Sequence, residues 1–180
     1  MVRLHRPANP EKFPSVRAIF EVISASERVS VPVLVDPKFR SFDLYRKVKL
    51  FKPNFKELVT GLKLDLNKKE IGKIAEAMLK FQKKQQIEHF LVTLSDQGVI
   101  SAVDGEYLHI PAIKREITDV SGAGDTVIAV AALCQVAGFT SGEIATISNL
   151  AGGQVCEKAG VVPIHGEKLL EECLIHFKSP

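Results

Sequence analysis

Short apolar runs alternate with segments of helical period along this chain, and this alternation restricts its fold more than any other feature. Val31–Asp36 is a continuous apolar run that ends in a carboxylate, as parallel strands buried on both faces do, and Lys49–Asn54 resembles it. Apolar residues at helical spacing predict five helices: 15–27, 67–86, 126–137, a segment from Thr140 past Asn149, and 166–177. The alternation predicts an α/β fold of three layers, with a mostly parallel sheet between two layers of helices.

Three further strands are expected close together, at residues 89–95, 99–103 and 106–110. The pair Asp104-Gly105 between the last two favours a local antiparallel hairpin. Capping-box patterns, in which an acid follows three residues after the cap, predict helix starts at Asn67 and at Thr140. Residues 1–14 have no periodicity and are interpreted as an N-terminal arm, which leaves 15–180 as one folded part.

Composition excludes several classes of protein. With 46% hydrophobic residues and a net charge of +3 in 180 residues, the chain is not a disordered one. No apolar run spans a bilayer and no signal peptide is visible, so we expect a cytoplasmic protein that does not bind membranes. Scattered lysines and few aromatic residues argue against nucleic acid. The three cysteines have no metal-ligand spacing and are expected to be reduced.

The segment Gly122-Ala123-Gly124-Asp125 is the most informative motif. Glycines directly before a helix allow a tight turn and leave amide N–H groups accessible, and these donors form an anion site together with the helix dipole. An aspartate beside such a site can accept a proton from a substrate hydroxyl, as phosphoryl transfer requires. Equally open is a plain helix-start role for Asp125, because short glycine motifs are weak signals.

The run Asp119-Val120-Ser121-Gly122-Ala123-Gly124-Asp125 resembles the C-terminal signature of the PfkB, or ribokinase-like, carbohydrate kinases. The resemblance implies a ribokinase-like sheet and ATP-dependent phosphorylation of a sugar. It also implies that Asp125 is the catalytic base, and that the amides of Gly122, Ala123 and Gly124 form the anion hole for the γ-phosphate.

Other segments resemble the same family in order and spacing. Asn54 and Glu57 match a motif that places Mg²⁺ and phosphate through water, although the same spacing is also a capping box and both roles are compatible. The remaining matched positions imply contacts with ATP phosphates at Thr93, Ser95 and Gly98, with adenine at Asn149 and Gly152, and with a monovalent cation at Asp119. A plain hairpin turn stays open as the role of Thr93, Ser95 and Gly98, and simple helix packing stays open as the role of Asn149 and Gly152.

The set of motifs looks most like the heptose-7-phosphate kinase domain of bifunctional heptose kinase/ADP-heptose synthases. This implies a sugar phosphate as substrate, D-glycero-D-manno-heptose 7-phosphate, used for ADP-heptose and the lipopolysaccharide core. Asp36 and Lys38, at the carboxyl end of a strand, are then substrate contacts, or else a strand-ending turn with a solvated lysine.

The resemblance covers only the second part of such a kinase, and we find no counterpart of the N-terminal part with its lid and sugar-binding residues. Missing strands would uncover apolar surface, so a homodimer is expected. Two alternatives remain beside an active sugar kinase. They are a truncated, catalytically deficient nucleotide-binding fragment and a structural α/β protein without nucleotide.

Overall fold

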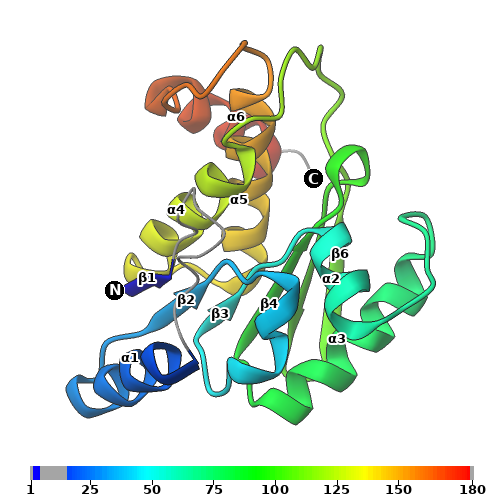
Figure 1. Cartoon of the computed structure of the whole chain (residues 1–180). Helices are drawn as coiled ribbons and strands as arrows, with labels where there is room; N and C mark the ends of the chain where they lie inside the picture. Colours follow the sequence, from blue (N-terminus) through cyan, green and yellow to red (C-terminus); the bar gives the residue numbers. More distant parts are fainter. Residues whose placement is uncertain (1, 5–15, 179–180) are drawn as a thin grey trace. The chain divides into compact units, whose positions relative to one another are not determined.

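The structure, a computed structural model, describes residues 2–4 and 16–178 (Figure 1). Its strands are β1 (Val2–Leu4), β2 (Val33–Val35), β3 (Leu50–Phe51), β4 (His89–Thr93), β5 (Val99–Val103) and β6 (Glu106–Ile110). Its α-helices are α1 (Val16–Val29), α2 (Phe55–Leu62), α3 (Ile71–Gln85), α4 (Ala123–Val136), α5 (Ser141–Val155) and α6 (Gly166–Lys178). Two short 3₁₀ helices are η2 (Phe39–Leu44) and η3 (Ser95–Gln97).

The strands follow one another in the sheet in chain order, from β1 to β6. The first four are parallel neighbours, with Leu4 opposite Val35, Val35 opposite Phe51, and Phe51 opposite Phe90. Helices connect most of these parallel strands, as crossover connections require. The register aligns the carboxyl ends of β2 and β3, whereas β4 continues three residues beyond Phe90, from which it follows that the residues after β2 and β3 are neighbours.

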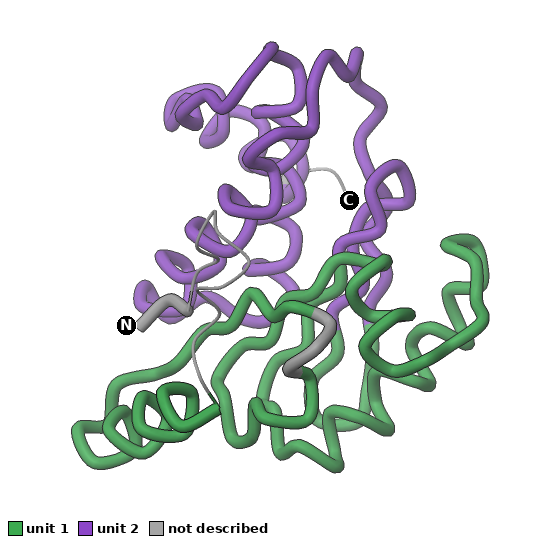
Figure 2. Tube along the Cα trace, viewed as in Figure 1, with its two compact units in different colours: residues 1–92, 102–107 green, residues 93–101, 108–180 purple. Residues whose placement is uncertain are grey.

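Two compact units make up the chain, and each is described separately (Figure 2). Unit 1 is residues 1–92 and 102–107, and unit 2 is residues 93–101 and 108–180. None of the helices within the described ranges has the length and apolarity that crossing a bilayer requires.

Unit 1 has an aromatic core on its parallel strands. Phe51 meets Phe42 edge to face, with ring centroids 5.1 Å apart, and meets Phe90 in the same way at 5.2 Å. Phe81 of α3 completes the cluster. A Cβ at Gly61 would lie 2.7 Å from the Phe42 ring, so the glycine allows α2 to approach this core closely. The buried rings therefore determine how α2 and α3 pack in unit 1.

Unit 2 is built around the close packing of α4 on α5. Both helices are mostly apolar, and residues 144–148 of α5 are all buried. A Cβ at Gly152 would lie 2.7 Å from Cγ2 of Val127, so only glycine lets the two helices approach this closely. Gly138, at φ 82°, follows the end of α4, as expected for a glycine that stops a helix. The capping box of Thr140 with Glu143 begins α5.

Several expected boundaries are wrong. The strands expected at 31–36, 49–54 and 89–95 are shorter than expected, and span only Val33–Val35, Leu50–Phe51 and His89–Thr93. The helix expected from Asn67 begins at Ile71, and the Glu70 carboxylate accepts from the Asn67 N–H in a turn before it. The helix expected from residue 126 begins at Ala123. A strand occupies Val2–Leu4 within the expected arm, of which residues 5–14 lie outside the described range.

His89 introduces a pH dependence into unit 1. Its side chain, in a residue that is 3% exposed, has a pKa lowered from 6.5 to about 4, first by burial and then by the charge of Lys49. Between pH 6.5 and 4 the unfolded chain binds a proton that the folded chain does not, so stability is lost as the pH falls through this window. We expect this loss to reach at most about 3 kcal/mol.

Urea unfolding between pH 7 and pH 4 measures this effect. The His89→Gln variant should show a smaller acid loss in its free energy of unfolding than the native chain. His176→Gln, which changes an exposed histidine, should retain the native pH dependence. Parallel curves for His89→Gln and the native chain would contradict the assignment.

Candidate functional site

Unit 2 contains a cavity of about 650 Å³. It is lined by residues from the turn after β4, from the segment after β6, from the start of α4 and from the second half of α5. Seven of the residues singled out in the sequence lie in its wall: Thr93, Ser95, Gly98, Ala123, Gly124, Asn149 and Gly152. The structure therefore brings three separate motifs to one cavity.

The turn between β4 and β5 forms one side of this cavity. Gly98 has φ 81° and ψ −130°, which suits glycine, and its N–H donates to the carbonyl of Ser95. A Cβ on Gly98 would lie 2.0 Å from the Ile110 oxygen. His109 Nε2 lies 2.7 Å from the Gln97 oxygen and holds the turn against β6. A tight turn is therefore present at these residues, and their contact with ATP phosphates stays a prediction.

The N-terminus of α4 forms another part of the wall. Gly122, at φ 79°, caps the helix without a side-chain hydrogen bond, whereas Asn54 and Thr140 supply one to α2 and α5. The Ala123 N–H donates to the carbonyl of Val120 at 3.3 Å, so this amide is already engaged within the turn. Asp125 is exposed in the first turn of α4, next to Gly124, and is not among the residues that line the cavity.

Two glycines of α5 face different neighbours. Gly152 allows contact with Val127, which supports its packing role, and it lines the cavity as well. A Cβ on Gly153 would lie 2.8 Å from Nε of Arg115. Asn149 Nδ2 donates to the Pro111 carbonyl at 3.0 Å and holds the segment after β6 on α5. Small and amide side chains on α5 therefore shape this side of the cavity.

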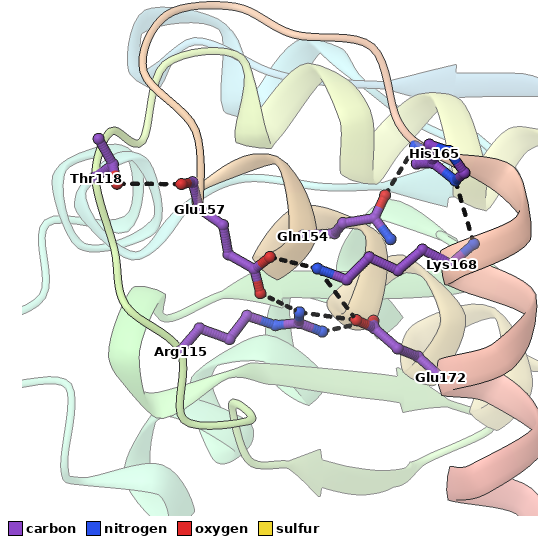
Figure 3. A network of polar contacts seen from close by, with 7 residues as sticks. All are labelled: Arg115, Thr118, Gln154, Glu157, His165, Lys168 and Glu172. Atoms are coloured by element: carbon purple, nitrogen blue, oxygen red, sulfur yellow. Dashed lines mark hydrogen bonds and ion pairs between the residues drawn. The ribbon is translucent and has the colours of Figure 1, made fainter.

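Arg115 lines the cavity and lies in an ionic network that the sequence did not suggest (Figure 3). Its guanidinium, 7% exposed, donates to both carboxylate oxygens of Glu172 on α6, at 2.9 and 2.6 Å, and to Glu157. Lys168 pairs with the same two acids. Hydrogen bonds from Lys168 and Arg115 lower the pKa of Glu157, and the bonds to Glu172 and Glu157 raise that of Arg115. The network ties α6 to the cavity wall.

Asp119 organises the loop before α4. Its Oδ1 accepts from the N–H and Oγ of Ser121 at 2.9 and 2.8 Å, and its Oδ2 accepts from the Gly160 N–H at 2.9 Å. The bonds from Ser121 and Gly160 lower the pKa of this carboxyl group. The described residues contain no cluster of three or more metal-ligating side chains. The cation role of Asp119 stays a prediction.

Unit 1 brings together the other predicted residues at the carboxyl edge of β2 and β3. Asp36 and Lys52 directly follow the paired residues Val35 and Phe51, so they are neighbours. Lys52, with 2% of its side chain exposed, places Nζ 3.1 Å from Oδ1 of Asp36. Lys38 Nζ lies 2.6 Å from Oε1 of Glu57 and 3.9 Å from Oδ2 of Asp36. We call Lys52, Asp36, Lys38 and Glu57 the charge chain.

Asn54 joins this group through the N-terminus of α2. Its Oδ1 accepts from the Glu57 N–H and its own N–H donates to Oε2 of Glu57, both at 2.9 Å. The capping-box interpretation is therefore confirmed, and the box holds the Glu57 side chain in place. Each Glu57 oxygen retains lone-pair capacity beside the cap, and the metal role of Asn54 and Glu57 stays a prediction.

Sequence reasoning missed two residues of these groups. Lys52 could have been found, because a lysine directly after a buried strand obeys the same edge-of-sheet rule that singled out Asp36. Arg115 lies in a polar stretch without periodicity, and no pattern in the sequence connects it with Glu157 and Glu172.

The fold and the cavity define an α/β protein with a cavity that reaches the glycine-rich N-terminus of a helix, a place where anions bind. Residues 12–165 match the family model described as pfkB family carbohydrate kinase. The chain belongs to this family.

Curated relatives of similar sequence are bifunctional proteins HldE. The chain is 32% identical over 158 residues to the one from Geotalea uraniireducens, and 37% identical over 156 residues to the one from Sulfurimonas denitrificans. These alignments cover 87% and 86% of this chain and 32% of each relative. The chain therefore spans about a third of the length of the curated relatives it matches.

Solved structures confirm the ribokinase-like α/β fold. Phosphofructokinase-2 from Escherichia coli in complex with potassium has a TM-score of 0.83 at 16% identity, over 91% of this chain and 53% of that one. Arabidopsis thaliana ribokinase complexed with ribose and ATP has a TM-score of 0.73 at 22% identity, over 88% and 52%. The chain spans about half of these structures.

Proposed function

We propose that the chain is the nucleotide-binding part of an ATP-dependent kinase that phosphorylates a sugar phosphate, D-glycero-D-manno-heptose 7-phosphate. The observation that supports this most is the 650 Å³ cavity, whose wall includes Gly124 at the start of α4 in a chain of the PfkB family. The similarity to HldE proteins favours a heptose phosphate over other sugars.

In this proposal the cavity holds ATP. Asn149 and Gly152 lie beside the adenine, and Thr93, Ser95 and Gly98 lie beside the phosphates. The Gly124 amide, together with those of Gly122 and Ala123, stabilises charge on the γ-phosphate. The Ala123 N–H already donates to the Val120 carbonyl and would have to break this bond to reach a phosphate. The Gly124 amide is therefore the principal donor in this proposal.

Asp125 is the general base. Its carboxylate takes the proton of the substrate hydroxyl as the oxygen forms a bond to the γ-phosphorus, while the bond between that phosphorus and the ADP oxygen breaks. The exposed position of Asp125 in the first turn of α4 is compatible with contact with a substrate. Asp36 and Lys38 contact the substrate, with Lys38 directed to a phosphate group.

Mg²⁺ fits the donor set of unit 1. The carboxylates of Glu57 and Asp36 are hard oxygen ligands, and an ion that keeps its waters needs few direct protein ligands. Glu57 would accept hydrogen bonds from such waters and the exposed Asn54 would orient them. When bound, the ion neutralises phosphate charge.

A monovalent cation near Asp119 is part of the same proposal. A homodimer stays a prediction.

The test is ADP release from ATP with an acceptor panel of D-glycero-D-manno-heptose 7-phosphate, fructose 6-phosphate and ribose, alongside calorimetric titration with ATP. We expect ADP release with the heptose phosphate. ADP release with fructose 6-phosphate or ribose alone would support a sugar kinase and contradict the heptose phosphate as substrate. ATP binding without release would select the second candidate, a catalytically deficient nucleotide-binding fragment.

A further inference from the structure

Lys38 lies between the two carboxylates that the proposed function assigns to magnesium. Its Nζ is 2.6 Å from Glu57 Oε1 and 3.9 Å from Asp36 Oδ2, and the other oxygen of Asp36 accepts Lys52 Nζ at 3.1 Å. The other oxygen of Glu57 accepts the Asn54 N–H. Every carboxylate oxygen of the pair therefore already faces a positively charged or N–H group.

The charges of these four side chains cancel. Two ammonium groups and two carboxylates occupy one partly buried edge of the sheet, so the four side chains together present no net negative charge to a metal ion. A divalent cation that approaches Glu57 also meets the Lys38 ammonium within a few ångströms, where the repulsion between like charges is strong at the low dielectric of a partly buried site.

We propose that the Lys38 ammonium acts as a counter-cation of Glu57 and thereby prevents free divalent metal ions from binding to the acid pair. When a metal ion and a phosphorylated ligand bind together, Lys38 exchanges its ion pair with Glu57 for one with the phosphate group. The inference rests on the proposed function and adds a regulation to it. Lys38 thereby couples the entry of the metal to the entry of the phosphate, because the ammonium needs a new anionic partner before it leaves the old one.

The two lysines of the charge chain differ in their freedom to move. Lys52 has 2% of its side chain exposed and follows β3, where its backbone N–H donates to Val35 in the sheet. Lys38 has 24% of its side chain exposed and lies in the connection between β2 and η2. A long, flexible side chain at such a position can change partner without disturbing the sheet. Lys52 is the permanent partner of Asp36, and Lys38 is the exchangeable one.

The experiment is a titration of the nucleotide-free chain with Mn²⁺, an ion of similar ligand preference whose free form is detected by electron paramagnetic resonance. We expect Lys38→Met to bind Mn²⁺ at least about tenfold more tightly than the native chain, because one positive charge is removed beside the site. Lys38→Arg, which keeps the charge, should match the native chain. Lys38→Met combined with Glu57→Gln should lose the gain.

Lys47→Met is the matched control. Lys47 is an exposed lysine whose Nζ lies 3.7 Å from Oε1 of Glu27, and its ion pair does not involve Asp36 or Glu57. It should leave Mn²⁺ affinity unchanged. Equal affinity of the native chain and Lys38→Met, or an equal gain in Lys47→Met, would overturn the proposal. Lys38→Gln replaces Lys38→Met if the latter does not fold by circular dichroism. No ATP is present, so the result is independent of the kinase assay.

Discussion

Asp125→Asn is expected to reduce the rate of phosphoryl transfer by about 10³-fold while ATP still binds. The amide keeps the shape of the carboxylate but cannot accept the hydroxyl proton, and removal of a general base costs about 10² to 10⁴ in rate. The measurement is ADP release at saturating ATP and heptose phosphate, with ATP affinity determined by calorimetry.

Glu167→Gln provides the control for this variant. Glu167 is likewise an exposed acid in the first turn of a helix, here α6, and the change removes the same charge. Its rate should equal that of the native chain. If Asp125→Asn transfers phosphate as fast as Glu167→Gln, Asp125 is a helix-start residue and not the base.

The second large effect is expected in stability. Gly98→Ala should lower the free energy of unfolding by more than about 3 kcal/mol, because the backbone conformation is unfavourable for alanine and a clash with backbone is added to it. The new Cβ would lie 2.0 Å from the Ile110 oxygen and 2.5 Å from the Ala112 nitrogen. Backbone atoms cannot move aside as the end of a flexible side chain can. Nucleotide binding should weaken too, since Gly98 lines the cavity.

Gly105→Ala separates the two causes. Gly105 has φ 86°, and a Cβ there would have no atom within 4 Å, so this variant suffers only the conformational cost of about 1–2 kcal/mol. Urea unfolding of both variants compares them directly. Equal losses would show that the close approach to Ile110 does not matter for stability.

Local chemistry predicted part of the structure well. The strands expected at 99–103 and 106–110 have those bounds, and Asp104 and Gly105 between them both have positive φ, as the hairpin turn requires. The capping boxes at Asn54 and Thr140 are both present. These features depend on residues a few positions apart, so the sequence contains all that determines them.

Features that depend on distant partners were predicted less well. The strands β2 and β3 are shorter than the segments that predicted them, because the length of a strand depends on its pairing with distant segments of the chain. The run around Asn67 contains a capping-box pattern, yet the helix begins at Ile71. Helix α2 and the 3₁₀ helix η2 were not expected as elements, although the cap of α2 was. Val2–Leu4 pairs with β2 without any periodicity in its own sequence.

The candidate sites divide in the same way. The glycine-rich start of α4, the cap at Asn54 and the turn at Gly98 were predictable, because each depends on glycine or capping chemistry within a few residues. Only the tertiary structure decided which charges meet. Lys38 reaches Glu57 across 19 positions and Arg115 reaches Glu172 across 57. Strand register and helix packing bring such residues together, and neither can be read from the spacing of residues along the chain.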